Sequence, residues 1–300
     1  MKQSRVIALG FFDGVHLGHG ALLRCARDRA DALGCKAAAL TFDVHPQQVL
    51  TGKQVPLLTT AAERIRLMRE LYAMDEVMVL PFDNAMAAMD WEEFTERILL
   101  ERFGACHVVC GYDFSFGRKG LGTAERLREK CTAMGVGCDI IEQTRLDGVT
   151  LSSTHIRSLL EAGDVAEANR FLGHPYSISG PVISGKQLGR RLGIPTANVA
   201  VPEGILPPAN GVYAAKVRLP DGTVKLAVTN VGLRPTVEDG LGLMVEPWVL
   251  DFSGDLYGEE IRMEFHARLR PERRFDSLEE LKAEIFRNAD QTRVFFAANG

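Results

Sequence analysis

Near its N-terminus the chain passes from an apolar run into a glycine turn and then into an amphipathic helix. The run Val6–Leu9 ends at Gly10-Phe-Phe-Asp-Gly-Val-His-Leu-Gly-His19, whose glycines and aspartate predict that a buried strand stops there. His16 and His19 lie three residues apart, on one face of the helix start. Free N–H groups, the helix dipole and two imidazole donors there predict a phosphate site. The apolar positions at helical spacing are Leu17, Ala21, Leu22, Cys25, Ala26 and Leu33.

One alternative is that the two histidines only cap the helix. The order is not that of a P-loop, because no Gly-Lys-Ser/Thr follows the glycines. It is similar to the His-x-Gly-His signature of the nucleotidyltransferase superfamily. The fuller stretch resembles the N-terminal domain of bacterial bifunctional riboflavin kinase/FAD synthetases. The resemblance implies that His16 and His19 are catalytic and that Gly10, Phe12 and Gly18 belong to a nucleotide-binding site.

Length and composition bound the rest of the chain. Its 300 residues favour two domains, and 46% hydrophobic with 25% charged residues are ordinary for a soluble globular protein. The net charge of −4 argues against a general nucleic-acid binder, although Gly185-Lys-Gln-Leu-Gly-Arg-Arg191 is a local basic cluster. We therefore expect no nucleic-acid partner.

The predicted location is the cytoplasm, without a membrane segment. The first apolar run stops at Asp13 and makes a poor signal peptide, and no uncharged run is long enough to cross a bilayer. Six cysteines, which include no Cys-x-x-Cys pair, fall mostly where free thiols pack as small hydrophobes. We interpret them as reduced and structural, and we expect no zinc site.

Strand-like and helix-like segments alternate through the first half of the chain. This alternation predicts a parallel, doubly wound sheet with right-handed crossovers. Thr60 is the expected N-cap of the second helix. After the first strand and helix, the predicted strands are 36–42, 76–80, 107–110 and 136–141, and the predicted helices are 59–72, 91–103 and 123–134.

His45 follows the second predicted strand, at the strand end where open α/β sheets bind ligands. The alternative is a simple turn held by Pro46. The segment Thr41-Phe-Asp-Val-His-Pro46 resembles the family's Thr-Phe-x-Pro-His-Pro, with Val44 in place of the first proline. The resemblance implies that His45 contacts the flavin.

A loop rich in glycine and aromatic residues, Gly111-Tyr-Asp-Phe-Ser-Phe-Gly117, follows the fourth predicted strand. Such a loop suits close packing against a planar ring, and a plain glycine loop is the alternative. The loop resembles the family's Gly-x-Asp-Phe-x-Phe-Gly motif. The resemblance implies that Asp113, Phe114 and Phe116 bind the flavin.

The last motif of the first half is Leu151-Ser-Ser-Thr-His-Ile-Arg157, in which Ser152 or Ser153 is the expected N-cap of a helix. Hydroxyls, N–H groups and Arg157 at one helix start predict a second anion site, suited to the outer phosphates of ATP. A simple capping motif would explain the serines but not the arginine. The run resembles the family's Ile-Ser-Ser-Thr-x-Ile-Arg, which implies that Ser153, Thr154 and Arg157 bind the nucleotide.

The resemblance implies that this half transfers AMP from ATP to FMN and releases pyrophosphate. The attacking FMN phosphate has a second pKa of about 6 and is already anionic at neutral pH. The reaction therefore needs alignment and relief of charge rather than a general base. We assign His16 and His19 to the α-phosphate, and Ser153, Thr154 and Arg157 to the leaving pyrophosphate.

Beyond Leu172 the pattern changes to strand-like runs separated by Gly, Pro and Asn. The change predicts domains at 1–172 and 173–300, the second a small antiparallel β-barrel followed by C-terminal helices. Ser277 and Glu280 form a capping box at the start of the first C-terminal helix. The predicted strands are 176–184, 211–219, 224–231, 243–252 and 259–269, and the predicted helices are 162–172, 277–286 and 290–297.

The segments Gly180–Gly185 and Gly189–Asn198 together carry four glycines and two basic side chains. They lie near the expected barrel mouth, where they would wrap a nucleotide. Thr196 and Asn198 offer oxygen atoms, the hard ligands that Mg²⁺ prefers, and a turn is the alternative. The run resembles the Gly-x-Pro-Thr-Ala-Asn motif of riboflavin kinases. We assign Gly185, Lys186 and Arg190 to the nucleotide, and Thr196 and Asn198 to magnesium.

Phosphorylation of riboflavin needs a base, because the attacking alcohol is un-ionised at neutral pH. Glu246 matches the catalytic glutamate of riboflavin kinases, and a surface strand carboxylate is the alternative. The family has x-His after this glutamate, whereas the chain has Pro247 and Trp248. Pro247 cannot donate a ladder hydrogen bond, so we expect an edge strand or a bulge there. We expect Trp248 to pack in the core.

The resemblance covers nearly the whole chain. It implies an enzyme that phosphorylates riboflavin to FMN and adenylylates FMN to FAD, with Mg²⁺ as cofactor and ATP as co-substrate. The alternatives are a riboflavin kinase with an inactive first domain, a transferase for another phosphate ester, and a non-enzymatic flavin or nucleotide sensor. The intact histidine pair argues against the first alternative. The sequence leaves the oligomeric state open.

Overall fold

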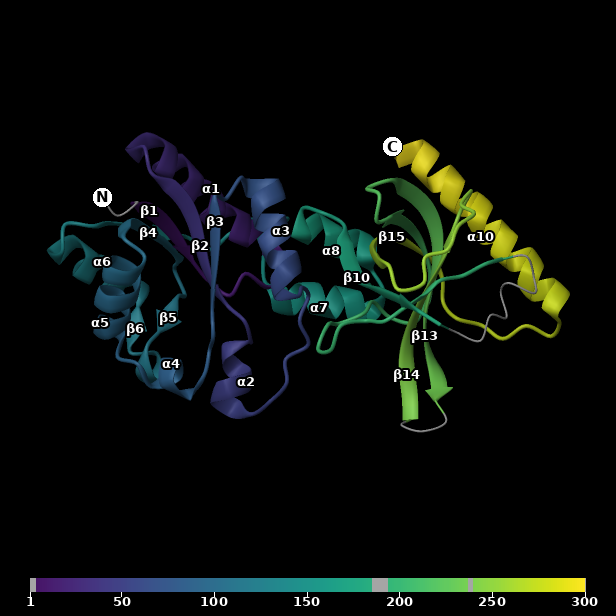
Figure 1. The fold of residues 1–300 in the computed structure, drawn as a ribbon, viewed down its shortest axis with the longest axis horizontal. Helices are drawn as coiled ribbons and strands as arrows, with labels where there is room; N and C mark the ends of the chain where they lie inside the picture. Colours follow the sequence, from purple (N-terminus) through teal and green to yellow (C-terminus); the bar gives the residue numbers. More distant parts are fainter. Residues whose placement is uncertain (1–3, 185–193, 237–239, 300) are drawn as a thin grey trace. The chain divides into compact units, whose positions relative to one another are not determined.

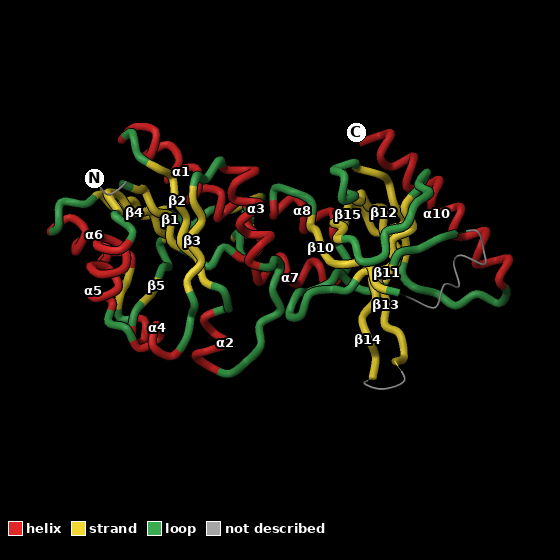
Figure 2. Tube along the Cα trace, viewed as in Figure 1, coloured by secondary structure: helices red, strands yellow, loops and turns green. Residues whose placement is uncertain are grey.

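The computed structural model describes residues 4–184, 194–236 and 240–299 (Figures 1 and 2). The chain divides into two compact units, Met1–Ser153 and Thr154–Gly300. Each unit has its own sheet and its own hydrophobic core.

Five strands of the first unit form one parallel sheet: β1 (Arg5–Leu9), β2 (Lys36–Phe42), β3 (Glu76–Leu80), β4 (Ala105–Gly111) and β7 (Gly137–Ile141). Their order is β3-β2-β1-β4-β7, and every neighbouring pair is parallel. The predicted parallel sheet is confirmed. The order reverses between β1 and β4, and open α/β sheets bind ligands at the carboxyl ends of the strands beside such a reversal.

The long helices of the first unit lie on both faces of this sheet, which confirms double winding (Figure 1). The helices and short pairs are η1 (Asp13–Val15), α1 (Leu17–Leu33), α2 (Pro46–Thr51), α3 (Ala61–Tyr72), α4 (Asn84–Ala88), α5 (Trp91–Glu93), η2 (Phe94–Arg102), β5 (Ser115–Phe116), η3 (Arg118–Gly120), β6 (Gly122–Thr123), α6 (Ala124–Ala133), β8 (Arg145–Leu146) and β9 (Val149–Thr150).

Strand β1 is the centre of the first core. Val6 and Ala8 pack with residues of α1 and α3 on one face, whereas Ile7 and Leu9 pack with residues of η2 and α6 on the other. Successive side chains of a strand point to opposite faces, so an unbroken apolar run is what a strand covered on both faces requires. The predicted helix 91–103 is present as α5 followed by the π-helix η2.

The strands of the second unit form a closed barrel in the order β10-β11-β14-β13-β12-β15. Every neighbouring pair with a recorded register is antiparallel, which confirms the predicted antiparallel barrel. The sequence did not predict β11, which has two residues. The strands are β10 (Tyr176–Ile183), β11 (Asn198–Val199), β12 (Gly211–Arg218), β13 (Val224–Thr236), β14 (Gly240–Val249) and β15 (Glu260–Arg270).

Of the edge or bulge expected at Pro247, the bulge is absent, whereas the edge is present on the β11 side, because β11 pairs with β14 only at Val245. Pro247 pairs with Thr229 inside a β13–β14 register that runs without a shift from Ala227 to Thr236. The carbonyl oxygen of Pro247 instead accepts a hydrogen bond from the N–H of Ala197, at 3.0 Å. The missing N–H of the proline therefore faces the short β11, where the ladder is nearly absent, and the proline costs no bond to β13.

Two helices, α7 (Ser153–Ala162) and α8 (Val165–Leu172), precede the barrel strands. The N–H of Ala209 donates to the carbonyl of Leu160 at 2.8 Å, and the Asn169 side chain donates to the carbonyl of Phe265 at 2.8 Å. From Thr154 onward these helices therefore belong to the second compact unit. The domain boundary at residues 172 and 173 stays a prediction.

The two predicted C-terminal helices are one continuous helix, α10 (Leu278–Asn299). Asn288, in the predicted break, is 1% exposed and accepts a hydrogen bond from Arg270 at 3.1 Å. The predicted capping box is present in part, because the N–H of Glu280 donates to Ser277 Oγ at 3.1 Å. The Glu280 carboxylate accepts from the N–H of Asp276, one residue before the expected partner.

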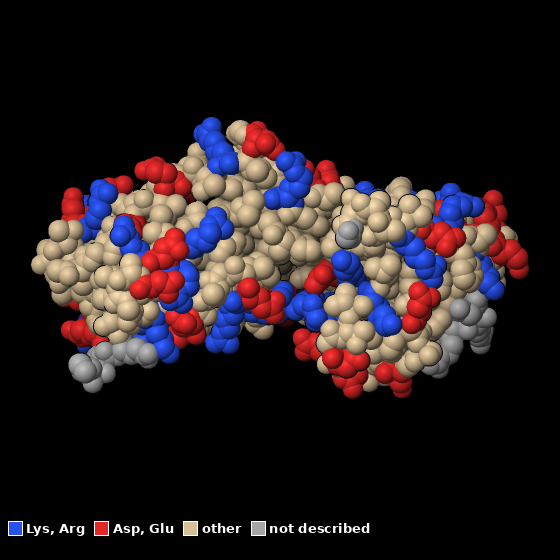
Figure 3. Space-filling model, turned by 90° about the horizontal axis from the view of Figure 1, so that it is seen from above, with Lys and Arg blue, Asp and Glu red and all other residues tan. Residues whose placement is uncertain are grey.

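All six cysteines are free. Among the described residues, no helix is both long and apolar enough to span a bilayer. On the face shown in Figure 3, basic and acidic side chains are interspersed.

Candidate active sites

The turn between β1 and α1 has a strained backbone. Phe12, Gly14 and Val15 have positive φ angles of 58°, 78° and 43°. Such angles cost glycine little, whereas a bulky or β-branched residue there stores about 1–3 kcal/mol of strain. The side chains of Phe12 and Val15 are fully buried in the core that α1 and α3 share, and this packing holds the turn in place.

Asp13 fixes the same turn from inside the protein. Its Oδ1 accepts hydrogen bonds from the N–H groups of Leu58 and Thr59, at 2.9 and 3.1 Å. The N–H of Gly14 donates to Thr59 Oγ1 at 2.9 Å. The buried aspartate of the motif therefore joins the turn to the segment that leads into α3, and its role is structural.

His16 and His19 stack against each other at the start of α1, with ring centroids 3.6 Å apart. Nδ1 of His16 accepts a hydrogen bond from the N–H of His19 at 3.3 Å, so His16 caps the helix through this nitrogen. Nδ1 of His19 is buried and has no hydrogen-bond partner among the described residues. Burial, together with the neighbouring charges of His16 and Arg64, holds the pKa of His19 well below its usual range. His19 is therefore neutral at pH 7.

The first turn of α7 begins beside this histidine pair. Ser153 Oγ donates a hydrogen bond to the carbonyl of Asp13 at 2.9 Å. A Cβ on Gly18 would lie 3.1 Å from the His16 ring and 3.3 Å from Cβ of Leu151, so this close approach favours glycine. Thus two of the motifs predicted to bind phosphate adjoin. Further along α7, Arg157 donates to Thr154 Oγ1 at 3.3 Å.

A pocket of about 180 Å³ opens at the carboxyl edge of the parallel sheet. Phe114 and Phe116 line it and stack on each other, with centroids 5.2 Å apart. Gly10 also lines it, and a Cβ there would lie 3.1 Å from the Phe12 ring. The structure thus gathers three of the predicted residues around one mainly apolar pocket.

Two predicted flavin-binding residues do not line this pocket. His45 is the N-cap of α2, where its Nδ1 accepts from the N–H of Gln47 at 3.2 Å, and its ring contacts Phe11. Asp113 is exposed. The hydrogen bond of His45 therefore fits the alternative of a simple turn. Pro46, the next residue, lines the pocket.

Sequence reasoning missed several pocket residues. They share one property, which is that they follow the carboxyl ends of β2 and β3, where parallel strands converge on a ligand site. Of the residues near these strand ends, only His45 was predicted to bind a ligand. The missed residues are Phe42, Leu50, Phe82, Met86 and Met89.

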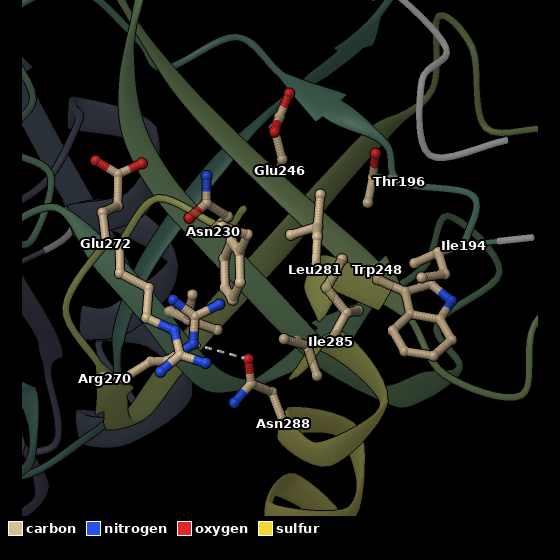
Figure 4. A pocket seen from close by; sticks show the side chains of 14 residues that line it. Ile194, Thr196, Asn230, Glu246, Trp248, Arg270, Glu272, Leu281, Ile285 and Asn288 are labelled. Carbon is tan, nitrogen blue, oxygen red and sulfur yellow. Dashed lines mark hydrogen bonds between the residues drawn. The ribbon is translucent and has the colours of Figure 1, made fainter. Parts of the chain in front are cut away.

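The second unit has a pocket of about 380 Å³ between the outer face of the barrel and α10 (Figure 4). Val245 and Val249 are buried in alternation with half-buried Glu246 and Trp248, so the latter pair faces outward to the pocket. The helix contributes Leu281, Ile285 and Asn288.

Glu246 and Thr196 line this same pocket, and Figure 4 shows both at the side away from Arg270 and Asn288. Glu246 pairs with Asn230 across the β13–β14 ladder, which fixes the position of the strand that carries it. Glu246 is therefore half-buried at the wall of a pocket, and its catalytic role stays a prediction. Trp248 packs against the buried cluster around Val228, which confirms the expected core packing. It also lines the pocket, where its ring contacts Phe286 edge-on with centroids 5.5 Å apart.

Asn198 and Thr196 fit a hard cation. Oδ1 of Asn198 is buried without a hydrogen-bond partner among the described residues, as an oxygen awaiting a ligand would be. Asn198 opens β11, two residues after Thr196. Carboxamide and hydroxyl oxygens suit Mg²⁺. The predicted nucleotide-binding residues Gly185, Lys186 and Arg190 lie outside the described residues.

The end of the pocket opposite Glu246 carries charges of both signs, from Arg270, Arg273 and Glu272, to which we assigned no role from the sequence. Arg270 and Arg273 stack on Phe275, with their guanidinium carbons 5.4 and 4.8 Å from the ring centroid. Glu284 is buried and pairs with Arg270 at 3.4 Å and Arg273 at 3.0 Å. Burial lowers the pKa of Arg270. Arg270 and Arg273 lie in the run 270–281, which extends the family resemblance, whereas their partner Glu284 comes from α10.

Comparisons with known proteins identify a family for each half of the chain. The FAD synthetase family model matches residues 1–155, and the riboflavin kinase family model matches residues 172–296. The bifunctional riboflavin kinase/FMN adenylyltransferase of Listeria monocytogenes is 37% identical, over 98% of this chain and 93% of its own length. The protein of the same name from Pseudomonas fluorescens is 38% identical, over 95% and 90%.

A solved structure extends the similarity to the fold. The crystal structure of a Streptococcus pneumoniae protein described as a macrolide-efflux protein matches with a TM-score of 0.87 and 29% identity, over 98% of this chain and 95% of that one. That description agrees with neither family model, whereas the two models and the curated relatives agree with each other. The chain therefore belongs to the family of bifunctional riboflavin kinase/FMN adenylyltransferases.

Proposed function

We propose that the chain phosphorylates riboflavin to FMN with ATP and then adenylylates FMN to FAD with release of pyrophosphate. The observation that supports this most is the presence of two chemically different sites. The first unit has stacked imidazoles at a helix start, one buried and one half-buried, and the second has a carboxylate and a threonine that line one pocket wide enough for a ring. The imidazoles suit an attacking group that is already charged, such as a phosphate, whereas the carboxylate suits an attacking hydroxyl that must lose a proton.

In the adenylyl transfer, an oxygen of the FMN phosphate bonds to the α-phosphorus of ATP as the bond to pyrophosphate breaks. Charge grows on the α-phosphate oxygens, and no proton needs to move. His16 and His19 donate hydrogen bonds to those oxygens, together with N–H groups at the start of α1. A neutral His19 is a donor of this kind. Ser153, Thr154 and Arg157 hold the leaving pyrophosphate.

The flavin of FMN occupies the pocket at the sheet edge. The stacked rings of Phe114 and Phe116 offer an apolar, planar wall, and Gly10 leaves space at the end of β1. Phe12 and Gly18 support the nucleotide site through the backbone of the turn. Roles of His45 and Asp113 in flavin binding stay predictions.

In the kinase reaction, Glu246 accepts the proton of the riboflavin hydroxyl as its oxygen bonds to the γ-phosphorus of ATP and ADP leaves. Trp248 and Ile285 offer apolar surface for the flavin ring. Mg²⁺ held by Thr196 and Asn198 would neutralise phosphate charge. Gly185, Lys186 and Arg190 stay predicted nucleotide ligands.

The test is a double dissociation between the sites. Purified protein is incubated with ATP, Mg²⁺ and either riboflavin or FMN, and the flavins are separated by chromatography. We expect FMN and FAD from riboflavin. Glu246→Gln should lose FMN formation from riboflavin but still convert supplied FMN to FAD. His19→Ala should do the reverse.

Two other product patterns would each favour an alternative function. FMN without FAD from the unaltered protein would favour a kinase with an inactive first domain. Formation of neither product would favour a flavin or nucleotide sensor. Cytoplasmic location and the absence of a nucleic-acid partner stay predictions.

A further inference from the structure

Arg64 of α3 is a fully buried arginine that forms no ion pair with a carboxylate among the described residues. Its side chain is 0% exposed, and its hydrogen bonds go to oxygen atoms of Phe11, Thr41 and Phe42. Burial lowers the pKa of Arg64 to about 10, while Asp13 and Asp43 act in the opposite direction. The guanidinium is therefore charged at pH 7. Burying a charge without an ion pair costs several kcal/mol, so its presence calls for an explanation.

The guanidinium joins two strand ends. Nη1 donates to the carbonyl of Phe11 at 2.8 Å, and Nη2 donates to the carbonyl of Phe42 at 2.9 Å. Thr41 Oγ1 donates to the same Phe11 carbonyl at 2.8 Å. The guanidinium carbon also lies 4.2 Å from the centroid of the Phe11 ring, which in turn contacts His45.

Both strand ends carry predicted motifs of the first site. Phe11 directly precedes the strained turn that leads to the histidine pair, and Phe42 ends β2 and lines the apolar pocket. A single side chain from α3 thus sets the spacing between the phosphate-binding turn and the pocket wall.

We propose that Arg64 is a positioning residue for adenylyl transfer, which holds the carboxyl ends of β1 and β2 at the spacing that the transfer requires. This inference rests on the proposed function of the first unit. Arg64 acts through the two backbone carbonyls and the Phe11 ring. Misplacement of reacting groups by about 1 Å can cost about 100-fold in rate, which sets the scale of the expected effect.

The same charge has a second, separable consequence at His19. The groups that face the His19 imidazole are His16, stacked on it at 3.6 Å, the Phe12 ring at 5.3 Å, and the cation of Arg64. Burial, His16 and Arg64, in that order, lower the pKa of His19. Removal of the arginine charge raises this pKa, so His19 becomes protonated at a higher pH than in the unaltered protein.

The experiment compares three variants for FAD formation from FMN across pH. Arg64→Met removes the charge and both donors, and Arg64→Lys keeps a cation that can donate to the same carbonyls. The matched control is Arg66→Met on the same helix, because Arg66 pairs with Glu63 and Glu70 at the surface. Riboflavin kinase activity of each variant, from the second unit, is the internal reference.

We expect Arg64→Met to lower kcat for FAD formation about 100-fold and to move the acidic limb of its pH profile to higher pH, with kinase activity unchanged. Arg64→Lys should recover most of the rate, and Arg66→Met should match the unaltered protein. FAD formation by Arg64→Met within about twofold of normal, with the same pH profile, overturns the inference.

A purely structural role has a different signature. If Arg64→Met unfolds the first unit, as judged by its tryptophan fluorescence, Arg64→Gln keeps one donor without the charge and takes its place. A normal kcat for FAD formation in Arg64→Gln then overturns the inference, and a reduced kcat with an unchanged KM for FMN supports it. If the unaltered protein forms no FAD, the proposed function itself fails, which is a distinguishable result.

Discussion

Asp13→Ala measures how strongly the phosphate-binding turn depends on one carboxylate. Oδ1 of Asp13 accepts hydrogen bonds from the N–H groups of Leu58 and Thr59, which are 0% and 4% exposed. The substitution leaves both donors buried without a partner. Each such group costs about 1–3 kcal/mol, so the free energy of unfolding of the first unit should fall by about 2–6 kcal/mol.

Urea unfolding followed by tryptophan fluorescence can assign this loss to one unit. The chain has two tryptophans, Trp91 in the first unit and Trp248 in the second. In a Trp248→Phe background the signal reports the first unit alone, and in a Trp91→Phe background it reports the second. Asp13→Asn keeps one oxygen acceptor and loses the charge, so it should cost only about 1–3 kcal/mol.

Asp13→Ala should also lower FAD formation while riboflavin kinase activity stays normal, because the aspartate shapes only the first site. An unchanged urea midpoint in the Trp91 signal would refute the reasoning. A loss seen equally in the Trp248 signal would also refute it, since the effect would then not be local.

Three further predictions concern other parts of the structure. Gly20→Ala places a Cβ 2.3 Å from Oη of Tyr72, so it should lower the unfolding free energy of the first unit by about 1–3 kcal/mol in the same urea assay. Phe114→Ala removes one ring of the stacked pair and should raise KM for FMN about tenfold in FAD formation, without affecting KM for riboflavin. Burial, followed by the charge of Lys216, lowers the pKa of His266 to about 4, so the unfolded chain binds the extra proton between about pH 6.5 and pH 4. The free energy of unfolding of the second unit therefore falls as the pH drops through this range, by about 2 kcal/mol at pH 5. His266→Gln should remove this part of the acid sensitivity, as reported by Trp248 fluorescence.

The pattern of apolar residues predicted both sheets, because strands covered on two faces and strands of a barrel leave different periodicities. It did not predict β11, since two residues are too few to show alternation. It also split α10 at Asn288, which looks like a surface position. In the fold the Asn288 side chain is buried and forms hydrogen bonds with Arg270 and Gln291. The spacing of apolar residues cannot predict such polar contacts.

Some residues of the candidate sites could be predicted from the sequence, and others could not. Local spacing predicted the histidine pair, whereas the resemblance to the family implied the roles of Phe114 and Glu246. Arg270 and Phe82 reach their pockets from segments that only the tertiary fold brings near. From the sequence Arg64 looks like an ordinary helix arginine, and nothing in its neighbourhood along the chain distinguishes it from Arg66, which is half-buried and ion-paired.

The second pocket lies between the barrel's exterior and α10, while the interior is filled by side chains such as Tyr213 and Phe265. Ligand preference and barrel integrity are therefore encoded by different sets of residues. Libraries of substitutions confined to the inward surface of α10, at Leu281 and Ile285, can explore altered flavin analogues with the supporting scaffold untouched.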